Sequence, residues 1–166
     1  FPKGYVSLAR GFSNTGKSTS VLEAVVGAQK SGILPIIFDL ENNIGRYRLS
    51  VMGFDWDGDY IKIDNEYLLD EFGKKRYPKR NEASIEDLAE CIHFFLNEQE
   101  AGHLPKEILF AIDSIGILNC NMSIAAQTKN TSDNNQWNAG AYEKVFMSMF
   151  NNTIPNSRGI TSKYTN

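Results

Sequence analysis

The sequence has little cysteine and histidine, with two residues of each type among 166. Cys91 and Cys120 stand far apart, and no second cysteine or histidine completes the spacing of a zinc site. Both are therefore predicted to be reduced, packed thiols. His93 falls off the apolar face of its predicted helix and His103 lies in a predicted loop, so neither is assigned a role as a ligand or a base.

The sequence also lacks a long apolar run and an excess of positive charge. No stretch approaches the roughly 20 apolar residues that cross a bilayer, and residues 1–4 lack the charged-then-apolar order of a signal peptide. A formal net charge of -3 argues against nucleic-acid binding through bulk positive charge and leaves only a local basic site for it. We therefore expect a cytoplasmic protein without a membrane segment.

Apolar patterning alternates between strand and helix along the chain. Apolar runs predict strands at residues 5–10, 33–38, 60–63 (at an edge of the sheet) and 108–112. Apolar residues at helical spacing predict helices from residue 17 to Gly32, then at 44–52, 84–99 and 139–150, with Ser84 and Asp87 placed for a capping box. This order predicts one three-layer α/β domain over residues 1–166, with a mostly parallel sheet and helices on both faces.

Residues 11–18 match the phosphate-loop pattern GxxxxGK(S/T) in full, between a predicted strand and a predicted helix. Its glycines let backbone N–H groups turn toward an anion, and the helix N-terminus adds the positive end of its dipole. Lys17 is expected to reach the β- and γ-phosphates of ATP, Ser18 to ligate Mg²⁺, and Thr19 to donate to the α-phosphate. A glycine-rich turn without a ligand is the alternative. The predicted loop consists of Gly11, Phe12, Ser13, Asn14, Thr15, Gly16, Lys17 and Ser18.

Two carboxylates follow predicted buried strands. Asp113 comes directly after the run at 108–112, where it can hold Mg²⁺ through a water or, alternatively, cap the next turn. Glu41 comes just past the run at 33–38, where a carboxylate can accept a proton from a water lined up behind the γ-phosphate. Its alternative role, shared with Asp39, is to open the following helix, since acidic side chains favour the helix N-terminus.

These segments resemble the RecA recombinases, including the UvsX-like branch found in phages. The opening FPKGYV is similar to the family's LPxG opening, and FDLEN at 38–42 is similar to its DxE strand end. GFD at 53–55 is similar to the family's LGVD segment, and IDS at 112–114 is similar to its VDS strand end. The resemblance covers nearly the whole chain and implies a P-loop NTPase fold of RecA type. It implies Glu41 as the general base for ATP hydrolysis, with Lys17, Ser18, Thr19 and Asp113 in the ATP and Mg²⁺ site.

The resemblance further implies a DNA-dependent ATPase that forms filaments on single-stranded DNA and promotes homologous strand exchange. The interval from Glu41 to Gly53 disfavours another RecA-fold motor, such as a replicative helicase or a clock-type ATPase. The non-enzyme alternative is a recombination mediator that kept the nucleotide fold and lost turnover. The intact set of Lys17, Glu41 and Asp113 argues against it.

The sequence departs from the family where an aromatic residue stacks on adenine. Arg48 stands there next to Tyr47, and either side chain can cover a base face, so both are candidates. For single-stranded DNA, the resemblance points to residues 127–138, where Trp137 can stack on an unpaired base or pack at the start of the next helix. The five basic side chains in the predicted loop at 74–80 are a second candidate, although solvated charge is the default interpretation of such a run.

The family sheet has one more buried strand, which the resemblance places after the end of this sequence. It would lie between the strands expected at residues 5–10 and 108–112, about 10 Å apart. We therefore expect an incomplete sheet whose unpaired edges invite pairing with another chain. The 166 residues are expected to be a fragment that lacks an N-terminal assembly segment and the C-terminal half of the core.

Overall fold

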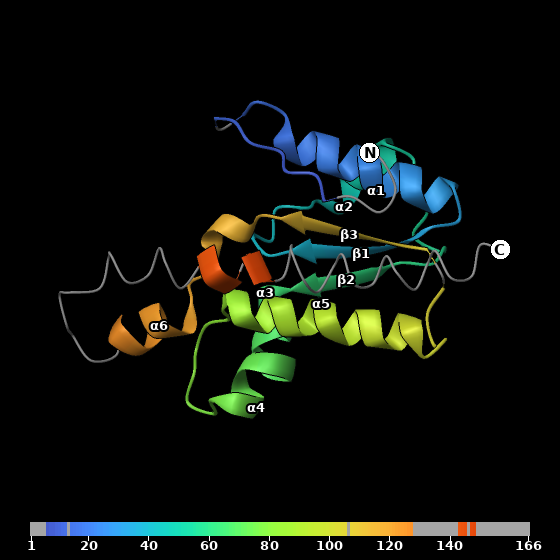
Figure 1. The fold of residues 1–166 in the computed structure, drawn as a ribbon. Coiled ribbons are helices and arrows are strands. Elements are labelled where there is room, and N and C mark those ends of the chain that lie inside the picture. Colours follow the sequence, from blue (N-terminus) through green and yellow to red (C-terminus); the bar gives the residue numbers. More distant parts are fainter. Residues whose placement is uncertain (1–5, 13, 106, 128–142, 146, 149–166) are drawn as a thin grey trace. The chain divides into compact units, whose positions relative to one another are not determined.

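Three parallel strands in the order β2-β1-β3 form the sheet of the computed structural model (Figure 1). The central strand β1 (Leu34–Asp39) lies between β2 (Ile61–Asp64) and β3 (Ile108–Asp113). The structure describes residues 6–12, 14–105, 107–127, 143–145 and 147–148. It confirms a mixed α/β architecture with a parallel sheet.

The burial of each strand follows its place in the sheet. All six residues of β1 are buried, as the unbroken apolar run predicted. In the described part of the chain β2 is an edge strand, as expected from its shorter and more polar sequence. For β3 the expectation of a buried strand is only partly right, because Ala111 alone is buried among its residues. It pairs with β1 on one side, and no described strand pairs with its other side.

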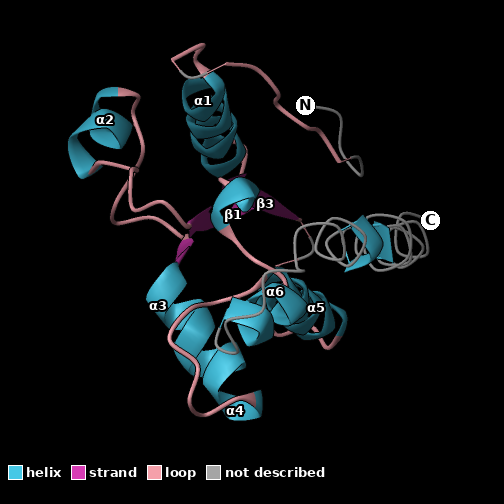
Figure 2. Cartoon of the chain, turned by 90° about the vertical axis from the view of Figure 1, so that its left-hand side faces the viewer, coloured by secondary structure: helices cyan, strands magenta, loops and turns pink. Residues whose placement is uncertain are grey.

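The helix α1 (Lys17–Lys30) lies along one face of the sheet (Figure 2). Its apolar side chains form one buried cluster with β1, β3 and α2 (Arg46–Val51), as their spacing predicted. Burial of each large side chain of this kind contributes about 1.5–3 kcal/mol relative to exposure. Gly53 ends α2 with a φ of +86°, a conformation that favours glycine. The cluster consists of Leu22, Val25, Val26, Ile37, Ile44, Leu49, Phe54 and Ala111.

The chain divides into two units, Phe1–Asp64 with Pro105–Ile115, and Asn65–Leu104 with Gly116–Asn166. The first unit holds the sheet, α1 and α2. The second holds helical segments. They are α3 (Asn65–Leu68), the π-helical turn η1 (Leu69–Gly73), α4 (Lys74–Arg76), α5 (Ile85–Glu100) and α6 (Asn121–Gln127), with the short 3-10 turn η2 (Ile115–Ile117) at the junction of the units.

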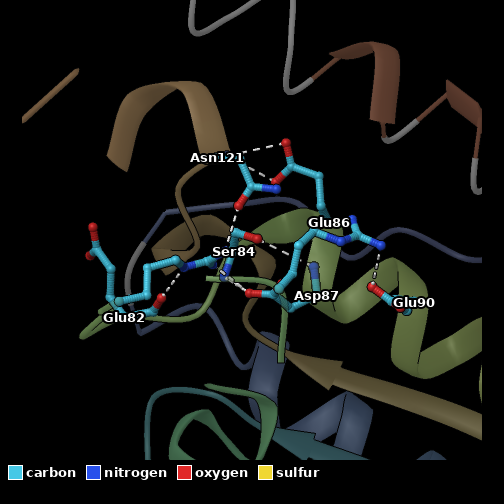
Figure 3. Close-up of polar contacts among 8 residues, drawn as sticks. Glu82, Ser84, Glu86, Asp87, Glu90 and Asn121 are labelled. Atoms are coloured by element: carbon cyan, nitrogen blue, oxygen red, sulfur yellow. Dashed lines mark hydrogen bonds and ion pairs between the residues drawn. The ribbon is translucent and has the colours of Figure 1, made fainter. Parts of the chain in front are cut away.

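A capping box starts α5, as the sequence predicted. The Ser84 hydroxyl accepts a hydrogen bond from the Asp87 N–H at 3.3 Å, and the Asp87 carboxylate accepts one from the Ser84 N–H at 2.8 Å (Figure 3). The neighbouring Glu86 carboxylate accepts a hydrogen bond from the Asn121 N–H at 3.0 Å. The first turn of α5 therefore also holds the start of α6.

Two expectations about elements are wrong. Residues 6–10 form no strand, and Val6 and Leu8 are 44% and 72% exposed. A strand exists through its ladder to a neighbour, and the described residues supply no neighbour here. Residues 74–76, expected in a loop, are helical because Lys74 and Lys75 pair with carboxylates one turn earlier.

Within the predicted helix at 139–150, the described residues 143–145 and 147–148 are helical. None of the helices in the described ranges combines the length and apolar character needed to span a bilayer.

Candidate functional site

All three strands end in an aspartate at the same edge of the sheet. In the register of the sheet, Asp39 of β1 is the partner of Asp64 on β2 and of Asp113 on β3. Parallel strands bring their carboxyl ends together, which is where ligands of open α/β sheets bind. The environments of these side chains decide which of them can take part in chemistry.

Asp113 and Ser18 meet at this edge. The Ser18 hydroxyl, in the first turn of α1, donates to Oδ1 of Asp113 at 3.2 Å. Both side chains are partly buried, so they are shielded from bulk solvent and still accessible to a ligand. The contact joins the phosphate-loop motif to the strand end that the sequence paired with it, across 95 positions of sequence.

The two oxygens fit a Mg²⁺ ion. The Ser18 oxygen can ligate the ion directly, and the Asp113 carboxylate, 3.2 Å from it, can hold the ion through one of its bound waters. Among the described residues no group of three or more His, Cys, Asp or Glu could hold a metal. A site of two protein oxygens suits Mg²⁺, which keeps waters and takes further ligands from phosphates.

The turn of the phosphate-loop motif ends at Gly16, directly before α1. Gly16 is the N-cap residue with φ of +86°, and no side chain caps the helix. Asn14 also has a positive φ, 62°, which asparagine tolerates better than most residues. Thr15 closes the turn by donating to the Phe12 carbonyl at 2.8 Å. Since no side chain of the described residues caps this end of α1, the N–H groups of its first turn can bind an anion.

Lys17 folds back over this loop. Its ammonium donates to the carbonyl oxygens of Gly11 at 2.9 Å and of Phe12 at 2.6 Å. Both acceptors are neutral, so these contacts hold the cation at the loop without cancelling its charge. Gly11 has no room for a side chain, since a Cβ there would lie 2.9 Å from the Thr15 hydroxyl. The loop therefore carries a positive charge beside the start of α1.

Asp39 and Glu41, which shared the alternative role of opening the following helix, have different environments. Asp39 is buried and accepts hydrogen bonds from the N–H groups of Asn43 at 2.9 Å and Ile44 at 3.3 Å. Its second oxygen pairs with Lys62 at 2.8 Å. Asp39 therefore holds the turn before α2 and does not cap the helix itself, which begins at Arg46 after Gly45.

Glu41 is exposed and its carboxylate faces the end of β3. Oε1 accepts a hydrogen bond from the Ser114 hydroxyl, and Oε2 accepts one from the Asn43 side-chain amide at 3.0 Å. Ser114 directly follows Asp113, to which it is joined by a cis peptide bond. Sequence reasoning did not single out Ser114 or Asn43, because their contacts depend on the register between β1 and β3.

The two candidates for the adenine contact are placed differently. The Arg48 guanidinium donates to the Thr19 hydroxyl in the first turn of α1. The Tyr47 ring is 84% exposed. Arg48 therefore lies beside the predicted phosphate-binding residues, while Tyr47 makes no contact there that would favour it.

The basic run at 74–80 is largely paired with carboxylates in the second unit. Lys74 pairs with Asp70 at 2.5 Å, Lys75 with Glu71 at 3.0 Å, Arg76 with Glu90 at 3.2 Å and Arg80 with Asp87 at 2.5 Å. These pairs favour the interpretation of a structural charge run over a DNA-binding loop. The other predicted DNA contact is the loop at 127–138 with Trp137, and all of it except Gln127 lies outside the described residues.

The structure thus brings together most of the predicted site residues. Lys17, Ser18, Asp113 and Glu41 all lie in the first unit. Ser13 lies outside the described residues. No protein-family model, curated protein or solved structure matches the chain.

Proposed function

We propose that this chain is the ATP-binding and ATP-hydrolysing core of a RecA-like DNA recombinase. The observation that carries the proposal is the 3.2 Å contact between Ser18 and Asp113. A phosphate-loop sequence alone can occur by chance. It is less expected by chance that its serine hydroxyl also contacts a carboxylate at the end of a strand. This pair is what a Mg²⁺–nucleotide site requires.

Each residue of the site has a distinct role in this proposal. Lys17 and the N–H groups at the start of α1 bind the phosphates, while Ser18 and Asp113 hold Mg²⁺. The bound ion would neutralise charge on the β- and γ-phosphates. Glu41 orients a water and accepts its proton, and Arg48 contacts the nucleotide beside Thr19.

The recombinase part of the proposal rests on the resemblance of the strand-end motifs to the RecA family. It includes binding to single-stranded DNA, DNA-stimulated hydrolysis and self-association into filaments. The alternatives are another RecA-fold motor and a mediator without turnover. DNA-stimulated ATP hydrolysis separates the mediator from the enzymes, and strand exchange separates the recombinase from the other motors.

The test measures ATP affinity with a fluorescent analogue, and hydrolysis with and without single-stranded DNA, over a Mg²⁺ titration. Ser18→Ala and Asp113→Asn should raise the Mg²⁺ concentration needed for half-maximal hydrolysis roughly tenfold or more, because the first removes an oxygen ligand and the second removes the negative charge that attracts the hydrated ion. Ser20→Ala is the matched control, since Ser20 is an exposed serine of the same helix. An unchanged Mg²⁺ requirement in both site variants, or no ATP binding by the parent protein, contradicts the proposal.

A further inference from the structure

The carboxylate of Glu41 has one donor on each oxygen. The Ser114 hydroxyl donates to Oε1, and the Asn43 amide donates to Oε2 at 3.0 Å. The two donors come from different places, Ser114 from the end of β3 and Asn43 from the turn after β1. An exposed glutamate side chain is otherwise free to rotate about three bonds.

Asn43 is itself held in place by the core of the first unit. Its backbone N–H donates at 2.9 Å to Oδ1 of Asp39, which is buried and paired with Lys62 at 2.8 Å. The turn that presents the Asn43 amide to Glu41 is therefore anchored on β1 and β2. Ser114 is anchored through β3, which pairs with β1 along its whole length.

We propose that Ser114 and Asn43 are positioning residues that fix the direction of the Glu41 carboxylate for ATP hydrolysis. A general base must lie within about 2.6–3.2 Å of the atom whose proton it takes, and small misplacements lower the rate strongly. An ionised carboxylate has about four lone-pair sites. One hydrogen bond on each oxygen leaves a site on each for water.

The position of Ser114 also links the two halves of the site. Asp113 contacts Ser18, the proposed metal ligand, and the next residue contacts Glu41, the proposed base. Two consecutive residues at the end of β3 therefore fix the position of the proposed base relative to the proposed metal ligand. This inference rests on the proposed function, because it assigns roles within that same site.

A purely structural role for Ser114 makes a different prediction. In that case its removal would lower stability or nucleotide affinity and would act equally with or without a carboxylate at position 41. A positioning role predicts a lower kcat at unchanged KM for ATP, and an effect that disappears when Glu41 is replaced. The two roles are therefore separable by kinetics.

The experiment compares the parent protein with Ser114→Ala, Ser114→Thr, Asn43→Ala and Glu41→Gln, and with Ser114→Ala combined with Glu41→Gln. Ser114→Ala and Asn43→Ala should each lower kcat roughly tenfold with KM and ATP affinity unchanged. Ser114→Thr keeps the hydroxyl and should restore most of the rate. Ser31→Ala is the control, since the Ser31 hydroxyl donates to the Gly27 carbonyl at the end of α1, before the start of β1, whereas the site lies after the end of β1.

The combined variant gives the decisive measurement. Residual hydrolysis in Glu41→Gln should not fall further when Ser114→Ala is added, because no base remains to be positioned. An equal loss in both backgrounds, or an unchanged kcat in Ser114→Ala, overturns the inference. Absence of ATPase activity in the parent protein would instead overturn the proposed function, so the two failures are distinguishable.

Discussion

Lys62 of β2 forms an ion pair with Asp39 of β1, with 2.8 Å between Nζ and Oδ2. The Asp39 side chain is 2% exposed and that of Lys62 is 37% exposed, so a buried carboxylate is paired with a cation that remains partly in water. Two backbone N–H groups, of Asn43 and Ile44, satisfy the other side of the carboxylate. Asp39 therefore stabilises the turn that carries Glu41 and is itself closed to substrate.

Replacement of Asp39 should affect stability first. Asp39→Ala removes the acceptor of two backbone N–H groups, of which that of Ile44 is buried, and the partner of Lys62. It should lower the free energy of unfolding by about 2–4 kcal/mol. Lys62→Met should cost less, about 1–2 kcal/mol, because the two N–H groups still hold the carboxylate. Urea unfolding measures both. Glu41→Ala, at an exposed position, is the control and should change the free energy of unfolding by less than about 0.5 kcal/mol. If Asp39→Ala cost no more than Glu41→Ala, the structural role assigned to Asp39 would be wrong.

Lys17 and Glu41 should separate binding from turnover. Lys17→Ala removes the cation at the loop and should weaken ATP affinity roughly a hundredfold, which corresponds to about 3 kcal/mol of charge-assisted hydrogen bonding. Glu41→Gln should leave affinity near normal and lower kcat by about 10²–10⁴-fold. Equilibrium binding and steady-state hydrolysis distinguish the two effects. Hydrolysis at the normal rate by Glu41→Gln would show that another group is the base.

The sequence was sufficient to predict the elements whose apolar residues repeat clearly. The buried run of β1 and the helical spacing of α1 and α5 predicted these elements, and Ser84 and Asp87 predicted the cap of α5. The meeting of Ser18 and Asp113 also followed, because a helix after the loop and a parallel strand bring their ends to one edge.

Other features depend on partners that a sequence pattern does not contain. The apolar residues at 6–10 suggested a strand, but strand formation needs a neighbour, and the described residues provide none. The helical turn at 74–76 has no apolar periodicity and is favoured by ion pairs one turn apart. The contact of Ser114 with Glu41 follows from the pairing of β1 with β3, which fixes two loops relative to each other.

The paired lysines of the basic run should contribute little to DNA binding. Lys74 and Lys75 each have a carboxylate partner one turn away, so the double variant Lys74→Ala with Lys75→Ala should leave affinity for single-stranded DNA unchanged. The slope of log affinity against log salt concentration is the sharper measurement, since each lost phosphate contact reduces it by about 0.7. A clear reduction of the slope would establish these lysines as DNA contacts.

Cys91 gives the stability a pH dependence. Burial raises the pKa of the Cys91 thiol from 9.0 to about 12. Between these values the unfolded chain loses the thiol proton while the folded chain keeps it, so stability falls as pH rises from about 9, by up to about 1.4 kcal/mol per pH unit. Cys91→Ala should remove this part of the slope. Urea unfolding of both proteins from about pH 8 to about pH 10 measures the difference, and equal slopes would show that the folded thiol titrates normally.

Arg80 and Arg76 belong to the same basic run but should differ in their effect on stability. The Arg80 side chain is 7% exposed and that of its partner Asp87 is 4% exposed, whereas Arg76 and Glu90 are 56% and 47% exposed. Arg80 also donates to the Asn121 side chain at 2.6 Å and to the Glu82 carbonyl at 2.9 Å. Its guanidinium therefore joins the segment before α5 to the start of α6.

Removal of Arg80 would leave the Asp87 carboxylate buried without its cation. Arg80→Ala should therefore lower the free energy of unfolding by about 3–5 kcal/mol, while Arg76→Ala should cost at most about 1 kcal/mol because water screens an exposed pair. Arg80→Lys should recover only part of the loss, since an ammonium cannot reproduce the several fixed donors of the guanidinium. Thermal and urea unfolding of the three variants would measure these costs, and similar values for Arg80→Ala and Arg76→Ala would mean that the Arg80 pair is as solvated as its exposed neighbour.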